Sequence, residues 1–146
     1  QRYSVDPDRV SHLWESLWYD HLAAYAAVDI ALDTFPMGGG VTTLDALWMG
    51  VPVVCLKGNT LGKRITSAIM TAAGLEDWVA TSHEELLDIA LGKAGNAGAL
   101  AFLRERMRER ISQSPLANPD IYVRLVEHRY REMWQRHCST KGEPPG

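Results

Sequence analysis

The stretch DIALDTFPMGGGVTTLDALWMGVPVV, residues 29–54, carries the pattern that decides the fold. It begins with an apolar run at 29–33 that is typical of a buried strand, and a second such run follows at 51–56. Between the two runs, a helix is expected to open at Thr42 or Thr43 and to end before the second strand. Strand, helix and strand in this order favour a parallel sheet, because a parallel pair needs a crossover connection.

Short apolar runs continue to alternate with helical patterns through the middle of the chain. A helix is expected at 61–73, ended by Gly74, and a last short strand at 79–80. Ser82-His-Glu-Glu has the spacing of a capping box and predicts a helix that ends in a small-residue loop at 92–98. We therefore expect an α/β fold, with a Rossmann-like parallel sheet and flanking helices.

Further elements are expected at both ends of the chain, and the C-terminal end is expected to be helical. Towards the N-terminus, the pattern is compatible with a short strand at 9–14 and a helix that has Asp20 as its N-cap. Asn118-Pro119 marks the start of the last helix, because proline is favoured at the first helical position. Two apolar stripes at helical spacing are expected to face the core: Leu100, Leu103, Met107 and Ile111 in the first, and Tyr122, Leu125, Val126, Tyr130, Met133 and Trp134 in the second.

The length limits the domain organisation. With 146 residues, the chain has room for one domain or for one lobe of a larger enzyme. We expect one lobe over residues 1–138, whose last helices, about 97–138, pack on it or on an N-terminal lobe outside this chain. Residues 139–146 are expected to form a flexible tail. Because Gln1 is not a natural start, we also expect the true N-terminus to lie further upstream.

Composition excludes some classes of partner. The formal net charge of -3 provides no basic excess for a nucleic acid, and the arginines at 104–110 alternate with glutamates as on a solvated helix face. Cys55 and Cys138 lie far apart without metal-binding spacing, which favours a reducing, cytoplasmic setting. Cys55 is expected in the core. No apolar stretch is long enough to span a membrane, and no signal-peptide pattern is present.

The glycine-rich loop after the first strand is the candidate ligand site. Ligands of parallel sheets bind at the carboxyl ends of the strands, which selects the loops at 34–41 and 57–60. Three glycines, residues 38–40, let a ligand approach the backbone, and Thr42 and Thr43 add hydroxyls at a helix N-terminus that favours anions. A diphosphate suits such a site. The same residues also fit a tight turn with Thr42 as N-cap, whereas the missing Gly-Lys-Ser/Thr argues against an ATPase loop.

Asp45 has two readings of the same kind. It follows Thr42 by three residues, so it fits the reciprocal partner of a capping box or a favourable charge at the helix dipole. In a nucleotide site, its carboxylate would accept hydrogen bonds from the ribose hydroxyls beside the diphosphate. The spacing alone leaves both readings open.

These residues resemble the polypeptide O-GlcNAc transferase family in its bacterial form. The resemblance runs in order through Asp29-Ile-Ala-Leu-Asp-Thr-Phe-Pro36, Gly39-Gly-Val-Thr-Thr43 and Asp45-Ala-Leu-Trp-Met-Gly-Val-Pro-Val-Val54. It continues through Gly58 with Arg64, Gly74-Leu75, the arginine-rich stretch, Ser114-Pro-Leu116 and Tyr130-Arg-Glu-Met-Trp134, and covers about residues 8–134. The resemblance implies that the chain is the C-terminal lobe of a two-lobed GT-B glycosyltransferase.

The resemblance implies an activity, a donor and partners. Family members transfer GlcNAc from UDP-GlcNAc to serine or threonine hydroxyls of proteins, with inversion at the anomeric carbon and without a required metal or other cofactor. Helical tetratricopeptide repeats upstream present the protein acceptor, and an N-terminal GT-B lobe completes the site. The catalytic residues are expected mostly upstream of this chain, and neither a nucleic acid nor a membrane is expected as a partner.

The resemblance also implies which residues of this chain bind UDP. Gly39, Gly40, Val41, Thr42 and Thr43 match the segment that contacts the diphosphate, and Asp45 matches the acid that contacts the ribose. His21 matches a histidine that lines the uridine pocket, and Ser16, Leu17 and Trp18 match the segment against the uracil. The amides and hydroxyls at 40–43 would stabilise the charge of the departing UDP. We therefore expect that alanine at both Thr42 and Thr43 lowers turnover strongly while folding stays intact.

Three positions depart from animal members of the family. Val41 stands where they have histidine, so a backbone N–H takes the place of one side-chain donor. Ala24 replaces an arginine and Trp18 a lysine of the uridine pocket, so base recognition is expected to rest on other groups, such as stacking by His21.

Two alternative functions stay open at this point. The first is a related transferase with another UDP-sugar, such as one that transfers glucose to asparagine, because no residue here reads the sugar's 2-substituent. The second is a non-catalytic lobe that binds a nucleotide or mediates assembly.

Overall fold

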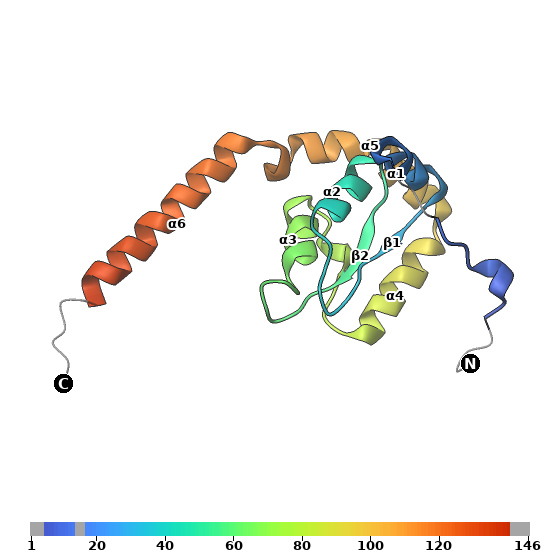
Figure 1. Ribbon diagram of the computed structural model, residues 1–146, viewed down its shortest axis with the longest axis horizontal. Helices are drawn as coiled ribbons and strands as arrows, with labels where there is room; N and C mark the ends of the chain where they lie inside the picture. Colours follow the sequence, from blue (N-terminus) through green and yellow to red (C-terminus); the bar gives the residue numbers. More distant parts are fainter. Residues whose placement is uncertain (1–4, 14–16, 141–146) are drawn as a thin grey trace.

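A small parallel sheet with helices on both faces forms the centre of the molecule (Figure 1). The computed structural model describes residues 5–13 and 17–140. In chain order, its elements are η1 (Pro7–Arg9), α1 (Trp18–Ala24), η2 (Tyr25–Ala27), β1 (Ala31–Leu32), α2 (Val41–Trp48), β2 (Val53–Leu56), α3 (Ile65–Ala72), η3 (Glu76–Trp78), β3 (Val79–Ala80), α4 (His83–Ala94), α5 (Ala97–Gln113), η4 (Pro115–Ala117) and α6 (Pro119–Thr140).

The sheet confirms the expected parallel arrangement with shorter strands. Its order is β1-β2-β3, and both pairs are parallel, with Ala31 opposite Val53 and Cys55 opposite Val79. In Figure 1, α2 and α3 lie on one side of the strands and α4 on the other, while α5 crosses the amino-terminal end. The loops that follow β1 and β2 therefore meet at the opposite edge, which is the carboxyl edge.

The expected first strand at 9–14 is wrong for the residues that the structure describes. Asp6 instead accepts a hydrogen bond from the amide of Asp8 at 3.1 Å and caps the single turn η1. Residues 10–13 are irregular and exposed, and Trp14 lies outside the described residues. Without a neighbouring strand, an extended segment has no ladder partner for its backbone groups.

Helix α1 also begins earlier than expected. Its N-cap is Leu17, which makes no side-chain capping bond, and Asp20 lies within the first turn rather than at the cap. The carboxylate therefore stays near the positive end of the helix dipole without closing a hydrogen bond to it.

The expected loop at 92–98 is largely helical. Helix α4 continues to Ala94, and α5 begins at Ala97, so only Gly95 and Asn96 separate them. The amide of Ala99 donates to Oδ1 of Asn96 at 3.1 Å, which supplies the N-cap that makes so short a link possible. Small residues here allow α4 and α5 to turn sharply within two residues, rather than forming an open loop.

Several expected helix ends are confirmed. Ser82 Oγ accepts from the amide of Glu85 at 3.1 Å, and the Glu85 carboxylate accepts from the amide and the hydroxyl of Thr81. The hydrogen bonds to the carboxylate, led by the one from the Thr81 hydroxyl, lower the pKa of Glu85. Gly74 adopts a φ of 68° after α3, a left-handed conformation that side-chain-bearing residues rarely adopt. Asn118 Oδ1 accepts from the amide of Ile121 at 3.1 Å at the start of α6.

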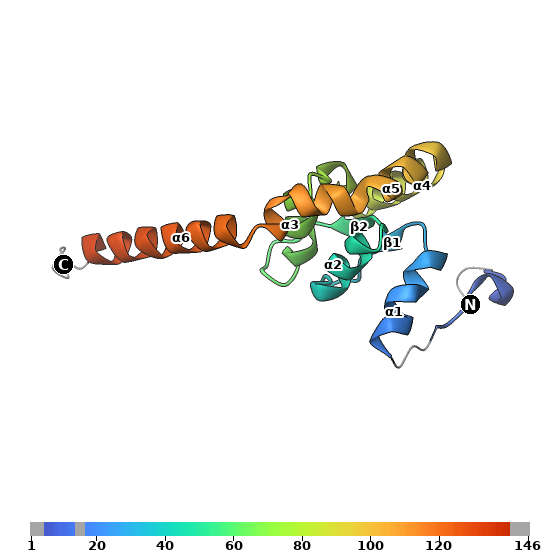
Figure 2. The same cartoon turned by 90° about the horizontal axis from the view of Figure 1, so that it is seen from above.

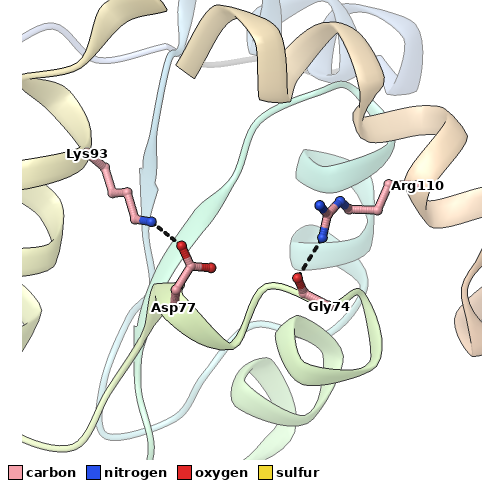
Figure 3. A network of polar contacts seen from close by, with 4 residues as sticks. All are labelled: Gly74, Asp77, Lys93 and Arg110. Atoms are coloured by element: carbon pink, nitrogen blue, oxygen red, sulfur yellow. Dashed lines mark hydrogen bonds and ion pairs between the residues drawn. The ribbon is translucent and has the colours of Figure 1, made fainter. Parts of the chain in front are cut away.

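Helix α5 is fastened to the lobe from its apolar side and by its arginines. Met107 and Ile111 are buried, as the first stripe predicts. Arg110 donates to the carbonyl of Gly74 at 2.6 Å, and nearby Lys93 of α4 pairs with Asp77 (Figure 3). These contacts join α5 and α4 to the segment between α3 and β3. The core includes Ala46, Leu47, Val51, Val53, Val54, Met70, Leu75 and Trp78.

Helix α6 departs from the expectation for the second stripe. It extends away from the rest of the molecule (Figure 1, Figure 2) and packs mainly against η4. Most of the stripe is exposed, including Tyr130 at 67% and Trp134 at 67%. The helix includes Ser139 and Thr140, so the expected tail is helical at its start, and residues 141–146 lie outside the described ones.

Candidate functional site

The glycine loop between β1 and α2 is held in place from three directions. The amide of Gly39 donates to Oδ1 of Asp33 at 2.8 Å, and the Thr66 hydroxyl of α3 donates to the Gly39 carbonyl at 2.8 Å. The amide of Gly38 donates to the carbonyl of Gly62 in the loop after β2 at 3.2 Å. Both backbone polar groups of Gly39 are therefore hydrogen-bonded within the protein.

Glycine is required at positions 38 and 39 by close contacts. A Cβ on Gly38 would lie 2.5 Å from the Thr66 hydroxyl oxygen, closer than any van der Waals contact. A Cβ on Gly39 would lie 2.7 Å from the Thr43 hydroxyl oxygen and 2.8 Å from that of Thr42. The two threonine hydroxyls thus converge on Gly39, although they lie one residue apart in the helix.

Helix α2 begins one residue before the expected threonines. Its N-cap is Gly40, which has no side chain, and no side-chain capping bond forms. Thr42 and Thr43 therefore lie within the first turn, and the interpretation of Thr42 as an N-cap is wrong. Within the described part of the chain, the backbone amides of Val41, Thr42 and Thr43 donate no hydrogen bond. This turn presents unpaired donors and the positive end of the helix dipole, which together favour an anion.

Asp45 does not act as the capping partner that its spacing suggested. The helix has a glycine at its N-cap, so the reciprocal hydroxyl of a capping box is missing. Asp45 is half-buried on α2, and its carboxylate raises the pKa of Tyr25, after the larger effect of that side chain's burial. Its negative charge therefore acts close to the Tyr25 hydroxyl.

Helix α1 carries the candidate base-binding residues. His21 is half-buried, and its ring lies 5.4 Å from that of Tyr25 in an edge-on arrangement and 6.1 Å from that of Trp18. Leu17 and Trp18 are exposed, at 64% and 55%. Ser16 lies outside the described residues. An aromatic face on α1 is therefore available to a planar ring.

A hollow of about 190 Å³ lies between the glycine loop, the first turns of α2, the strands β1 and β2, and Tyr25 of η2. It brings together three of the sequence-predicted residues, Gly39, Thr42 and Thr43, with Tyr25 and Asp33. Of the other predicted residues, Gly40 and Val41 continue the same turn, while His21 and Asp45 contact or approach Tyr25. Leu17 and Trp18 lie on the outer part of α1. The residues expected to contact a diphosphate thus lie close together, and Tyr25 links His21 and Asp45 to them.

A second hollow of about 210 Å³ at the same edge has residues that the sequence reasoning missed. It is lined by Phe35, Lys63 and His83, together with Asp33, Thr34 and Gly38. The rings of Phe35 and His83 lie 5.0 Å apart, edge to face. The loop expected after the second strand, 57–60, ends three residues before Lys63. The sequence pattern at 82–85 indicates only a helix cap, so it gives His83 no role in a site. Both residues follow strands that end at this edge.

The two cysteines differ in a way that labelling can detect. Cys55 is buried in β2, whereas Cys138 is exposed on α6. Burial, and to a smaller extent the negative charge of Asp33, raises the pKa of the Cys55 thiol to about 12. The thiolate is the reactive form. At pH 8 we therefore expect iodoacetamide to label Cys138 but not Cys55 in the folded protein, and both after denaturation. Peptide mass spectrometry checks this, and rapid native labelling of Cys55 would contradict its place in the core.

The described residues include no group of three or more histidine, cysteine, aspartate or glutamate side chains placed to hold a metal ion. No single helix among them is long and apolar enough to cross a membrane; α4 and α5, bent by 91° at their junction, pass that test only as a pair, by length and composition.

The sequence is similar to known glycosyltransferases over nearly its whole length. The sequence profile of glycosyl transferase family 41 matches residues 6–126. A probable UDP-N-acetylglucosamine–peptide N-acetylglucosaminyltransferase SPINDLY from Solanum lycopersicum is 37% identical over 139 residues, which are 94% of this chain and 15% of the relative. The corresponding SEC protein from Arabidopsis thaliana is 30% identical over 97% of this chain and 14% of its own length. The chain thus spans about one seventh of these curated relatives.

A solved structure shares the fold. A mutant of the O-GlcNAc transferase of Thermobaculum terrenum superposes with a TM-score of 0.81 and 40% sequence identity, over 94% of this chain and 26% of that protein. The likeness confirms the expected architecture of a GT-B lobe with a parallel sheet, flanking helices and long C-terminal helices.

Proposed function

Because the chain belongs to glycosyl transferase family 41, we propose that it is the donor-binding lobe of a longer protein, the parent protein, which transfers GlcNAc from UDP-GlcNAc to serine or threonine hydroxyls. One observation supports this most: the first turn of α2 has unpaired amides, and the Thr42 and Thr43 hydroxyls converge on Gly39 beside it. This arrangement suits the diphosphate of a nucleotide-sugar.

The proposed chemistry places the developing negative charge at the N-terminus of α2. The acceptor oxygen forms a bond to the anomeric carbon from the side opposite the leaving group, as the bond to the UDP oxygen breaks. UDP departs with the electron pair, and the acceptor proton passes to a base outside this chain. The amides of Val41, Thr42 and Thr43 and the two hydroxyls hold the departing diphosphate in the transition state. We propose that transfer needs no metal, so that EDTA leaves turnover unchanged.

The remaining UDP contacts follow the same proposal. Asp45 accepts from the ribose, and the face of α1 with His21 and Trp18 receives the uracil, together with Leu17 and Ser16. The neighbouring rings of Trp18 and His21 on α1 and of Tyr25 at the start of η2 support this, since a flat ring stacks on aromatic side chains.

The partners belong to the parent protein. The chain spans 26% of the solved relative, so most of a comparable enzyme lies outside it. We propose that an N-terminal GT-B lobe covers the exposed apolar side of α6 and completes the catalytic site, and that helical repeats upstream present the protein acceptor. Two unpaired cysteines support a cytoplasmic setting.

A titration of UDP into the parent protein tests the proposal. We expect saturable binding by calorimetry, with UDP-GlcNAc competing better than UDP-glucose. UDP-glucose competing better would favour the related transferase that uses another sugar. A folded parent protein that binds no UDP would contradict the donor site and favour a non-catalytic assembly lobe.

A further inference from the structure

Tyr25, the first residue of η2 directly after α1, also reaches α2. Its hydroxyl donates to the carbonyl of Thr42 at 3.2 Å, across 17 positions of the chain. Its ring meets that of His21 edge-on, with centroids 5.4 Å apart and planes at 78°. One side chain therefore touches both the proposed base-binding helix and the proposed diphosphate-binding turn.

The position of α1 depends on few contacts. The helix lies outside the body of the sheet and its covering helices (Figure 2). Among the described residues, its main packing partner is the turn η2, which begins at Tyr25. Tyr25 is half-buried and packs against the core, whereas Trp18 and Tyr19 at the other end of α1 are exposed. The orientation of His21 is thus set from the Tyr25 end of the helix.

The chemistry of Tyr25 suits a permanent donor. Burial and then the Asp45 carboxylate raise the pKa of Tyr25 above its ordinary value, so its hydroxyl stays protonated throughout the neutral range. A protonated phenol can donate to the Thr42 carbonyl, whereas a phenolate cannot.

We propose that Tyr25 is a positioning residue that fixes the spacing between the base-binding and diphosphate-binding halves of the donor site. The inference rests on the proposed function, because it requires one ligand that spans both helices. A base and a diphosphate joined in one molecule bind more tightly than either part, provided that the two half-sites are held at the ligand's own spacing. Tyr25 supplies that constraint without touching the reacting atoms.

The test compares a whole ligand with its two halves in the parent protein. Tyr25→Phe keeps the ring against His21 and removes only the hydroxyl, and Tyr19→Phe makes the same change on α1 at a residue that is 83% exposed. UDP is titrated by calorimetry, and uridine and inorganic pyrophosphate are measured by ligand-observed NMR.

We expect Tyr25→Phe to weaken UDP binding about five- to tenfold, from the worth of one hydrogen bond. Uridine and pyrophosphate should each bind within about twofold of wild type, because each half-site is intact, and Tyr19→Phe should bind all three as wild type does. Unchanged UDP affinity in Tyr25→Phe would overturn the proposal. An equal loss for UDP and both halves would also overturn it, since that indicates general damage. If wild type itself binds no UDP, the proposed function fails first and the inference fails with it.

Discussion

Replacing Thr42 and Thr43 together by valine in the parent protein is expected to lower kcat/KM for the nucleotide-sugar by about two to three orders of magnitude. The reason is that both hydroxyls lie beside Gly39 at the turn where we propose that the leaving group's charge develops, and losing one preorganised donor typically costs about 100- to 1000-fold in rate. The two losses need not add, because the hydroxyls converge on one place. Steady-state kinetics with UDP-GlcNAc measures the effect.

Valine is preferred to alanine because the two positions differ in burial. Thr43 is only 4% exposed, so alanine there would leave a cavity, whereas valine keeps the shape and removes the hydroxyl. Thr71→Val, at an exposed position of α3, is the matched control and should keep wild-type kinetics. Turnover within twofold of wild type in the double variant, with an unchanged melting temperature, would contradict a diphosphate at this turn.

Alanine at Gly39 is expected to abolish most UDP binding, with a loss of tenfold or more in affinity. Its Cβ would press on both hydroxyl oxygens from 2.7 and 2.8 Å, and Thr43 is too buried to move aside freely. Such overpacking also costs roughly 1–3 kcal/mol of stability. Calorimetric titration of UDP, beside a thermal melt, separates the two effects.

Gly62→Ala is the matched control for this variant. Its Cβ would lie 3.8 Å from two side-chain atoms of Met37, which is an ordinary contact, and the residue is in the neighbouring loop. We expect this variant to bind UDP as wild type does. If Gly39→Ala is folded and binds UDP as tightly as wild type, then the convergence of the two hydroxyls has no role in binding.

Local patterns predicted the elements well where short-range contacts form them. The Ser82 cap, the left-handed Gly74 and the buried stripe at Met107 and Ile111 each depend on residues within a few positions or on one helical face. Their physical cause lies in nearby backbone groups and in periodicity. The same reasoning failed at Asp20 and at 92–98. Asp20 lies inside the first turn of α1 and is not its N-cap, and most of 92–98 is helical instead of forming a loop.

The candidate site divides in the same way. The sequence alone could select the glycines and threonines as candidates, because a glycine-rich loop followed by hydroxyls at a helix N-terminus is a local pattern that favours an anion. Lys63, His83 and Tyr25 were missed as site residues, since their places depend on how separate loops and helices meet. The contact between Tyr25 and Thr42 has no signature in the chain.

The sequence by itself determined the parallel α/β lobe, its strand-to-helix order and the glycine loop that leads into α2, because periodicity, capping and glycine chemistry act over short distances. Only the tertiary structure decided that Asp33 and Thr66 hydrogen-bond to Gly39, that α2 starts at Val41, and that Tyr25, just after α1, contacts α2. It also decided that the apolar side of α6 has no cover within the described residues. Such contacts join residues far apart in the chain and depend on how all the elements of the lobe pack together, so no local sequence pattern predicts them.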